Sequence, residues 1–122
     1  MYEVYVTTQF SAAHQLKGYD GKFENLHGHN WTACVTVEAQ ELDEIGVGID
    51  FVKLKDMTEE LLAQLDYKNI NEIPPFDKQN PSAENIARWL YGKLGEQVNP
   101  SGARVKKVEI YEMPNCGAAY FE

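Results

Sequence analysis

The sequence predicts an α+β fold, in which an antiparallel sheet of four strands carries two helices on one of its faces. Segments with alternating apolar and polar residues lie near both ends of the chain, and two segments with apolar residues at spacings of three and four lie between them. This β-β-α-α-β-β order favours an antiparallel sheet, because strands that flank a helix pair are typical of α+β domains. A chain of 122 residues suits one domain, residues 1–122.

The strands are expected at residues 2–8, with a pattern that can extend to residue 14, and at 27–40, 104–113 and 117–121. The first helix is expected over residues 52–65, after a turn at 46–50. The second helix begins after Ser82, which is suited to the N-cap, and Gly95 is a candidate for its end. A loop rich in glycine, lysine and aspartate is expected at 17–25.

Charge and composition narrow the class of function. The net charge of −8 argues against nucleic-acid binding, which relies on lysine and arginine. No apolar run approaches the roughly 20 residues of a membrane span, and the start of the chain has no features of a secretory signal, so we expect the cytoplasm. Cys34 and Cys116 form no C-x-x-C pair and are expected to be buried thiols. Four strands leave two sheet edges, which predicts more than a monomer.

All three histidines of the chain stand in one constellation, formed by His14 and the pair His27 and His29. Residues two apart on a strand project from the same face, so this pair is in phase with the apolar Trp31. If the strand that carries His14 lies beside theirs, three imidazoles converge. Three nitrogen ligands with an open fourth position are typical of catalytic zinc. An ordinary strand pair of histidines without a metal is the alternative that spacing leaves open.

Glu112 shares an expected strand face with the apolar residues Val108 and Ile110. A carboxylate in that place either tilts to solvent or has a partner, because an unpaired buried charge is costly. A bound molecule that donates two parallel hydrogen bonds from one edge would be a suitable partner for this carboxylate.

Six motifs together resemble the 6-pyruvoyl tetrahydropterin synthase / 6-carboxytetrahydropterin synthase family. They are FSAAH (10–14), LHGHN (26–30), GIDF (48–51), LD (65–66), NPSAEN (80–85) and YE (111–112). The resemblance implies the T-fold (tunnelling fold), a Zn²⁺ cofactor, and a homohexamer built as a dimer of trimers with active sites between subunits. It also implies zinc binding by His14, His27 and His29, and pterin binding by Glu112, Ser82 and Glu84. The implied family substrate is 7,8-dihydroneopterin triphosphate.

The chain departs from the pyruvoyl and carboxy enzymes of this family in two places. Their catalytic cysteine stands four residues before the first histidine of H-G-H, where this chain has Phe23. They also pair an aspartate with a following histidine, whereas here Tyr67 follows Asp66. Asp66 is a candidate for orienting a proton carrier and Tyr67 for being that carrier. Simple packing near a helix end is the alternative for Tyr67.

Glu24 stands three residues before His27 and completes the pattern E-x-x-H-G-H. This pattern resembles a third type of the family, in which a glutamate takes over from the cysteine. The implied reaction cleaves the substrate side chain to give 6-hydroxymethyl-7,8-dihydropterin, a folate precursor, with Glu24 as general base. A solvated loop charge is the alternative for Glu24.

Three other functions stay open at this point. The first two are 6-carboxytetrahydropterin synthase, which serves the queuosine pathway, and 6-pyruvoyl tetrahydropterin synthase. The third is a non-catalytic protein that binds zinc or a pterin. The missing cysteine counts against both synthases.

Overall fold

The computed structural model describes residues 1–18 and 21–122, and residues 19–20 of the expected loop lie outside the described residues. Its strands are β1 (Tyr2–His14), β2 (His27–Ala39), β3 (Arg104–Met113) and β4 (Cys116–Phe121). Its helices are α1 (Phe51–Leu62) and α2 (Ala83–Val98), with short 3₁₀ helices η1 (Ile70–Glu72) and η2 (Asn99–Ser101). The expected order of strands and helices is confirmed. The sheet is antiparallel, with its strands in the order β1-β2-β3-β4.

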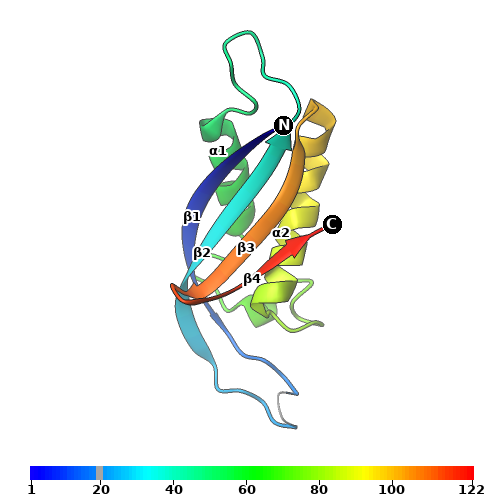
Figure 1. The fold of residues 1–122 in the computed structure, drawn as a ribbon. Helices are drawn as coiled ribbons and strands as arrows, with labels where there is room; N and C mark the ends of the chain where they lie inside the picture. Colours follow the sequence, from blue (N-terminus) through cyan, green and yellow to red (C-terminus); the bar gives the residue numbers. More distant parts are fainter. Residues whose placement is uncertain (19–20) are drawn as a thin grey trace.

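The two helices cover one face of the sheet, as expected, and no helix of the described residues lies on the other face (Figure 1). α1 packs over β1, and α2 packs over β3 and β4. Side chains alternate along each strand, so every second residue of β2 enters the core between the two layers. Those core residues are Trp31, Ala33, Val35, Val37 and Ala39.

β1 and β2 pair over their full length, from Tyr2 opposite Ala39 to His14 opposite His27. β1 therefore extends well beyond residue 8, because its last residues still have a partner strand. This register places the three histidines at one end of the sheet, on the face that the helices cover.

Both expected helix ends are corrected. α1 ends at Leu62 rather than at residue 65, and a turn leads to Tyr67, whose φ of +57° lies in the left-handed region. α2 does not end at Gly95, because Leu94 and Val98 are both buried and their packing carries the helix one turn further. The left-handed glycine lies beyond η2, at Gly102, with a φ of +96°.

Both cysteines are free, but the expectation that they are buried is wrong. Cys116 is exposed because it begins the edge strand β4, and Cys34 is half-buried because it lies on the helix-free face. No helix among the described residues combines the length and apolar character that a membrane crossing requires.

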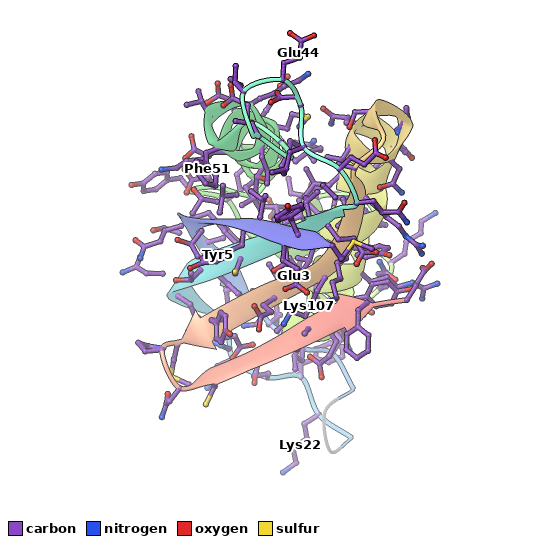
Figure 2. The ribbon with its side chains drawn as sticks, turned by 45° about the horizontal axis from the view of Figure 1, so that its top comes forward. Glu3, Tyr5, Lys22, Glu44, Phe51 and Lys107 are labelled. Carbon is purple, nitrogen blue, oxygen red and sulfur yellow. The ribbon has the colours of Figure 1, made fainter. Side chains whose placement is uncertain are left out.

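The helix-free face and the sheet edges display polar and aromatic side chains. Glu3 and Tyr5 of β1 and Lys107 of β3 are seen in front of the sheet in Figure 2. In the part of the chain that is described, β1 and β4 have a neighbouring strand on one side only. Tyr5 and Phe121 on these edge strands are each 66% exposed.

We expect Ile86→Ala to destabilise the protein by about 2–5 kcal/mol, because Ile86 of α2 is fully buried and its loss leaves a cavity. Ile45→Ala is the matched control. Ile45 is 83% exposed, so this variant should change the free energy of unfolding of the protein by less than about 0.5 kcal/mol. Denaturant unfolding at one protein concentration measures both. Equal changes in the two variants would contradict the described core.

Candidate functional site

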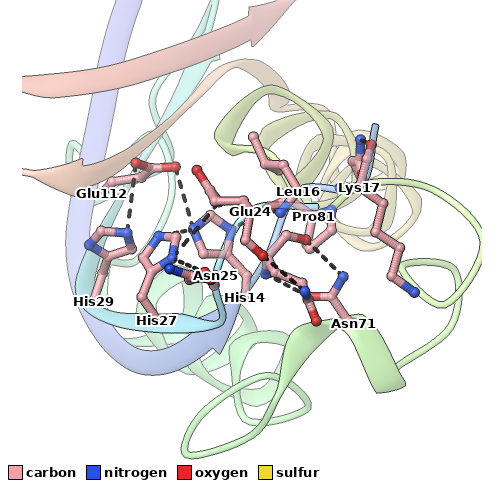
Figure 3. A network of polar contacts seen from close by, with 12 residues as sticks. His14, Leu16, Lys17, Glu24, Asn25, His27, His29, Asn71, Pro81 and Glu112 are labelled. Carbon is pink, nitrogen blue, oxygen red and sulfur yellow. Dashed lines mark hydrogen bonds and ion pairs between the residues drawn. The ribbon is translucent and has the colours of Figure 1, made fainter. Parts of the chain in front are cut away.

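The three histidines come together at the end of the sheet (Figure 3). His14 lies opposite His27, and Ala12 lies opposite His29, so the register brings the rings to one place. One nitrogen of each ring lies within 4.8 Å of the others. The expected convergence of the three imidazoles is confirmed.

Two backbone carbonyls set the tautomers of His14 and His27. The Nδ1 atom of His14 lies 2.8 Å from the Pro81 carbonyl oxygen, and the Nδ1 atom of His27 lies 2.7 Å from that of Asn25. A carbonyl oxygen can only accept, so each neutral ring carries its proton on Nδ1 and has a bare Nε2. These two Nε2 atoms face each other at 3.2 Å. Two lone pairs at this distance repel each other unless a cation or a shared proton lies between them.

His29 adds a third nitrogen in need of a partner. Its Nε2 atom is buried and has no hydrogen-bond partner within residues 1–18 and 21–122. Burial lowers the pKa of His29, although the nearby Glu112 opposes this, so the neutral form that a metal requires is favoured. Trp31 packs edge-on against His14 and His29, with ring centres 4.7 Å and 5.2 Å away, and restricts how these two rings can turn.

These residues fit a zinc ion on their own chemistry. Metal-bound histidines typically donate their second ring N–H to a carbonyl or carboxylate, as His14 and His27 do here. Three imidazole nitrogens leave one position of a tetrahedral zinc for a substrate or water.

Glu112 faces the histidines from β3. Its Oε1 lies 3.8 Å from Nε2 of His14, and its Oε2 lies 3.8 Å from Nε2 of His29. The carboxylate is 28% exposed and does not tilt away to solvent. Its oxygens face the same Nε2 atoms that could hold a metal, and they can also accept two hydrogen bonds from a ligand. Its two possible roles are therefore fourth metal ligand and partner of a ring edge.

Glu24 also lies beside the cluster, although it belongs to the loop after β1. Its Oε1 lies 3.8 Å from Nδ1 of His27 and accepts a hydrogen bond of 3.2 Å from the backbone N–H of Leu16. The side chain is 33% exposed. The Leu16 N–H therefore holds this carboxylate, although it is partly solvated, on the Nδ1 side of His27. Phe23, at the position of the family's cysteine, is 71% exposed.

Of the other four candidate residues, Asp66 and Ser82 support the fold within one chain, whereas Tyr67 and Glu84 are exposed. The Oδ1 atom of Asp66 accepts a 2.8 Å hydrogen bond from the Ser11 N–H, which fixes the turn after α1 to β1. Tyr67 is 86% exposed, and Ser82 caps α2, as predicted, by accepting from an N–H of the first turn. Glu84 is exposed in that same turn. Within the described residues, none of the four is shown in hydrogen-bond contact with the histidines.

Sequence reasoning missed the groups that orient the site. The carbonyls of Pro81 and Asn25 and the N–H of Leu16 are backbone atoms, which no residue type reveals. The sequence had indicated the place of Trp31, because it follows His27 and His29 in phase on β2.

Comparison with known proteins gives consistent matches over nearly the whole chain. The sequence pattern of the family described as 6-pyruvoyl tetrahydropterin synthase matches residues 3–122. The 6-carboxy-5,6,7,8-tetrahydropterin synthase of Synechocystis sp. is 33% identical over 126 residues, which cover 99% of this chain and 94% of that protein.

Two further relatives extend this picture. The dihydroneopterin monophosphate aldolase of Pyrococcus furiosus is 33% identical over 103 residues, which cover 84% of this chain and 82% of that protein. The solved Caenorhabditis elegans 6-pyruvoyl tetrahydropterin synthase superimposes with a TM-score of 0.83 at 28% identity, covering 99% of this chain and 95% of that one.

We expect the purified protein to bind zinc and His29→Ala to bind it more than about 100-fold more weakly, since even the loss of a residue that only supports a ligand costs 10–100-fold. Competition with a zinc chelator measures the affinity. Asn30→Ala is the control, because Asn30 lies on the same strand but accepts its hydrogen bond from Ser11 on the opposite face. Equal affinity of the two variants would contradict the site.

The same titration on Glu112→Ala separates the two roles of that carboxylate. Unchanged zinc affinity is expected if Glu112 accepts hydrogen bonds from the ring of a bound small molecule. A loss of affinity like that of His29→Ala identifies Glu112 as the fourth ligand of the metal.

Proposed function

This chain belongs to the 6-pyruvoyl tetrahydropterin synthase family, and we propose that it cleaves the side chain of 7,8-dihydroneopterin triphosphate with a zinc ion bound. The pterin product would be 6-hydroxymethyl-7,8-dihydropterin, a folate precursor. Its relatives are pterin side-chain enzymes, which supports the class of substrate.

The observation that carries this proposal is the placement of Glu24. A carboxylate stands 3.8 Å from His27, in a chain that has Phe23 where a cysteine base or nucleophile would stand. Neither free cysteine replaces it, because Cys34 lies on the helix-free face and Cys116 begins β4. Both acid–base groups beside the histidines, Glu24 and Glu112, are carboxylates, which favours carboxylate chemistry.

The three histidines would hold the zinc ion, which supplies Lewis-acid polarisation of the substrate's side-chain hydroxyls. The carbonyl partners of His14 and His27 would hold their Nδ1–H groups, so that the Nε2 atoms turn inward. Trp31 limits rotation of the His14 ring by its edge-on contact and helps to exclude water from His14, which is only 1% exposed.

Glu24 would take the proton from the second side-chain hydroxyl. The bond between the two hydroxyl-bearing carbons then breaks, and that oxygen becomes the carbonyl of a two-carbon aldehyde that keeps the phosphate chain. The electron pair of the broken bond passes into the dihydropterin ring, and the carbon attached to the ring is protonated afterwards. This is a retro-aldol step, and it needs no oxidant or reductant.

Glu112 would accept two parallel hydrogen bonds from the 2-amino-pyrimidinone edge of the ring. Its two oxygens face the site from β3, while Glu24 approaches from the loop after β1. Holding the ring in this way would bring the side chain to the histidines and align it for reaction.

Two alternatives follow from particular relatives. The Synechocystis relative favours 6-carboxytetrahydropterin synthase activity. The Pyrococcus furiosus relative acts on the monophosphate by its name, which favours the same cleavage on a shorter phosphate ester.

We also propose that the protein works as a homohexamer, a dimer of trimers. The sheet has unpaired outer edges at β1 and β4 in the described part of the chain, and such edges need protection. Tyr5 and Phe121 on these strands, and Phe51 at the start of α1, are 65–66% exposed and would be covered by neighbouring copies.

The direct test incubates the zinc-loaded protein with dihydroneopterin triphosphate and, separately, with the monophosphate, and identifies the pterin by mass. The expected product is 6-hydroxymethyl-7,8-dihydropterin with release of a phosphorylated two-carbon aldehyde. A 6-carboxy or 6-pyruvoyl product would refute the proposal. Zinc and pterin binding without turnover would identify a non-catalytic protein.

Glu24→Gln should lower kcat by about 10²–10⁴-fold, because a positioned general base typically contributes that factor. Its zinc content should not change, since Glu24 does not contact the Nε2 atoms. Glu44→Gln makes the same exchange in the exposed loop at the opposite end of the molecule from Lys22 (Figure 2) and should keep full activity. Normal turnover by Glu24→Gln would remove the assigned base.

A further inference from the structure

The backbone that holds Glu24 is itself held by two side chains. Gln15, Leu16 and Lys17 continue beyond β1, where no strand of the described chain pairs with them. Instead, the Gln15 N–H donates to Oδ1 of Asn71 at 2.8 Å, and Nδ2 of Asn71 donates to the Gln15 carbonyl at 2.9 Å.

Asn80 repeats this arrangement two residues further along. The Lys17 N–H donates to its Oδ1 at 2.8 Å, and its Nδ2 donates to the Lys17 carbonyl at 2.9 Å. A carboxamide offers one acceptor and donors on the same group, as the residue of a neighbouring strand does. Asn71 and Asn80 therefore take the place of a partner strand.

This pairing determines which way Leu16 points. Successive residues of an extended chain turn their N–H and C=O groups to opposite sides. Because residues 15 and 17 face the asparagines, Leu16 faces Glu24 (Figure 3). The Leu16 carbonyl accepts from the Glu24 N–H at 2.9 Å, and the Leu16 N–H donates to the Glu24 carboxylate at 3.2 Å. The Gln15 side chain adds a bond of 3.0 Å to the Glu24 carbonyl.

Both asparagines are anchored in the helical layer. Asn71 belongs to η1, and its N–H donates to the side chain of Asn69 at 3.1 Å. The Asn80 carbonyl accepts from Asn85 of α2 at 2.9 Å. Next to Asn80, Pro81 accepts from His14, so one short segment orients both a histidine and the strand substitute.

We propose that Asn71 and Asn80 are positioning residues, which set the carboxylate of Glu24 beside the histidine cluster through the backbone of residues 15–17. The inference rests on the proposed function, because the positioning matters for turnover only if Glu24 is the base. A displacement of about 1 Å at a reacting group can cost up to about 10²-fold in rate.

The test uses Asn71→Asp, which keeps the size of the side chain and its acceptor but replaces the donor with an oxygen that faces the Gln15 carbonyl. We expect kcat on dihydroneopterin triphosphate to fall about 10–10²-fold, with KM and zinc content unchanged. Asn80→Asp is the second variant and should act in the same direction.

Asn99→Asp is the matched control. The Asn99 side chain accepts one hydrogen bond of 3.0 Å from the Val105 N–H at the other end of the sheet, where an aspartate serves equally well. It adds the same negative charge and should keep the wild-type kcat. A loss in this control equal to that of Asn71→Asp would overturn the inference.

A double-mutant cycle shows whether the asparagine acts through Glu24. In the Glu24→Gln background, Asn71→Asp should lower kcat no further, and an equal loss in both backgrounds would overturn the positioning role. If Glu24→Gln alone turns over normally, the proposed function has failed instead. Amide hydrogen exchange over residues 15–26 then decides the inference, since faster exchange at Leu16 in Asn71→Asp supports it and unchanged exchange overturns it.

Discussion

Two imidazole nitrogens, on His14 and His27, face each other at 3.2 Å, and the carbonyls of Pro81 and Asn25 keep the protons on the far sides of the rings. Neutral rings in this arrangement direct two lone pairs at one point, which is unfavourable unless positive charge lies there. The strand register makes the encounter unavoidable, because His14 stands directly opposite His27. The third nitrogen, on His29, is buried without a partner in the described chain and completes a site suited to a metal cation.

Two carboxylates lie on different sides of the three histidines. Glu112 comes from β3 and faces His14 and His29, whereas Glu24 comes from a loop and lies beside His27. Negative charge on both sides favours a cation among neutral rings. The two groups differ in support: Glu112 stands on a strand, and Glu24 depends on the backbone of Leu16 for its place.

Because Glu24 depends on Leu16, the backbone beyond the end of β1 needs hydrogen-bond partners, and the carboxamides of Asn71 and Asn80 provide them. A strand positions its side chains through its neighbours, but residues 15–17 lie past the last paired residues of β1. Asn71 and Asn80 supply the missing hydrogen bonds from the helical layer, so a loop residue gains positioning comparable to that of a strand residue. The turn after α1 does similar work nearby, where Asp66 binds the backbone of Ser11.

The order of strands and helices, the common face of His27, His29 and Trp31, and the cap at Ser82 could all be predicted from the sequence, because they follow from the period of the backbone or from contacts within one turn. Local signals failed at Gly95, where burial of Val98 extends the helix. Only the tertiary structure decided that His14 meets His27, that Glu24 contacts Leu16, and that Asn71 pairs with Gln15, 56 residues away in the sequence. Such contacts depend on strand register and on how the layers pack, which no short-range pattern records.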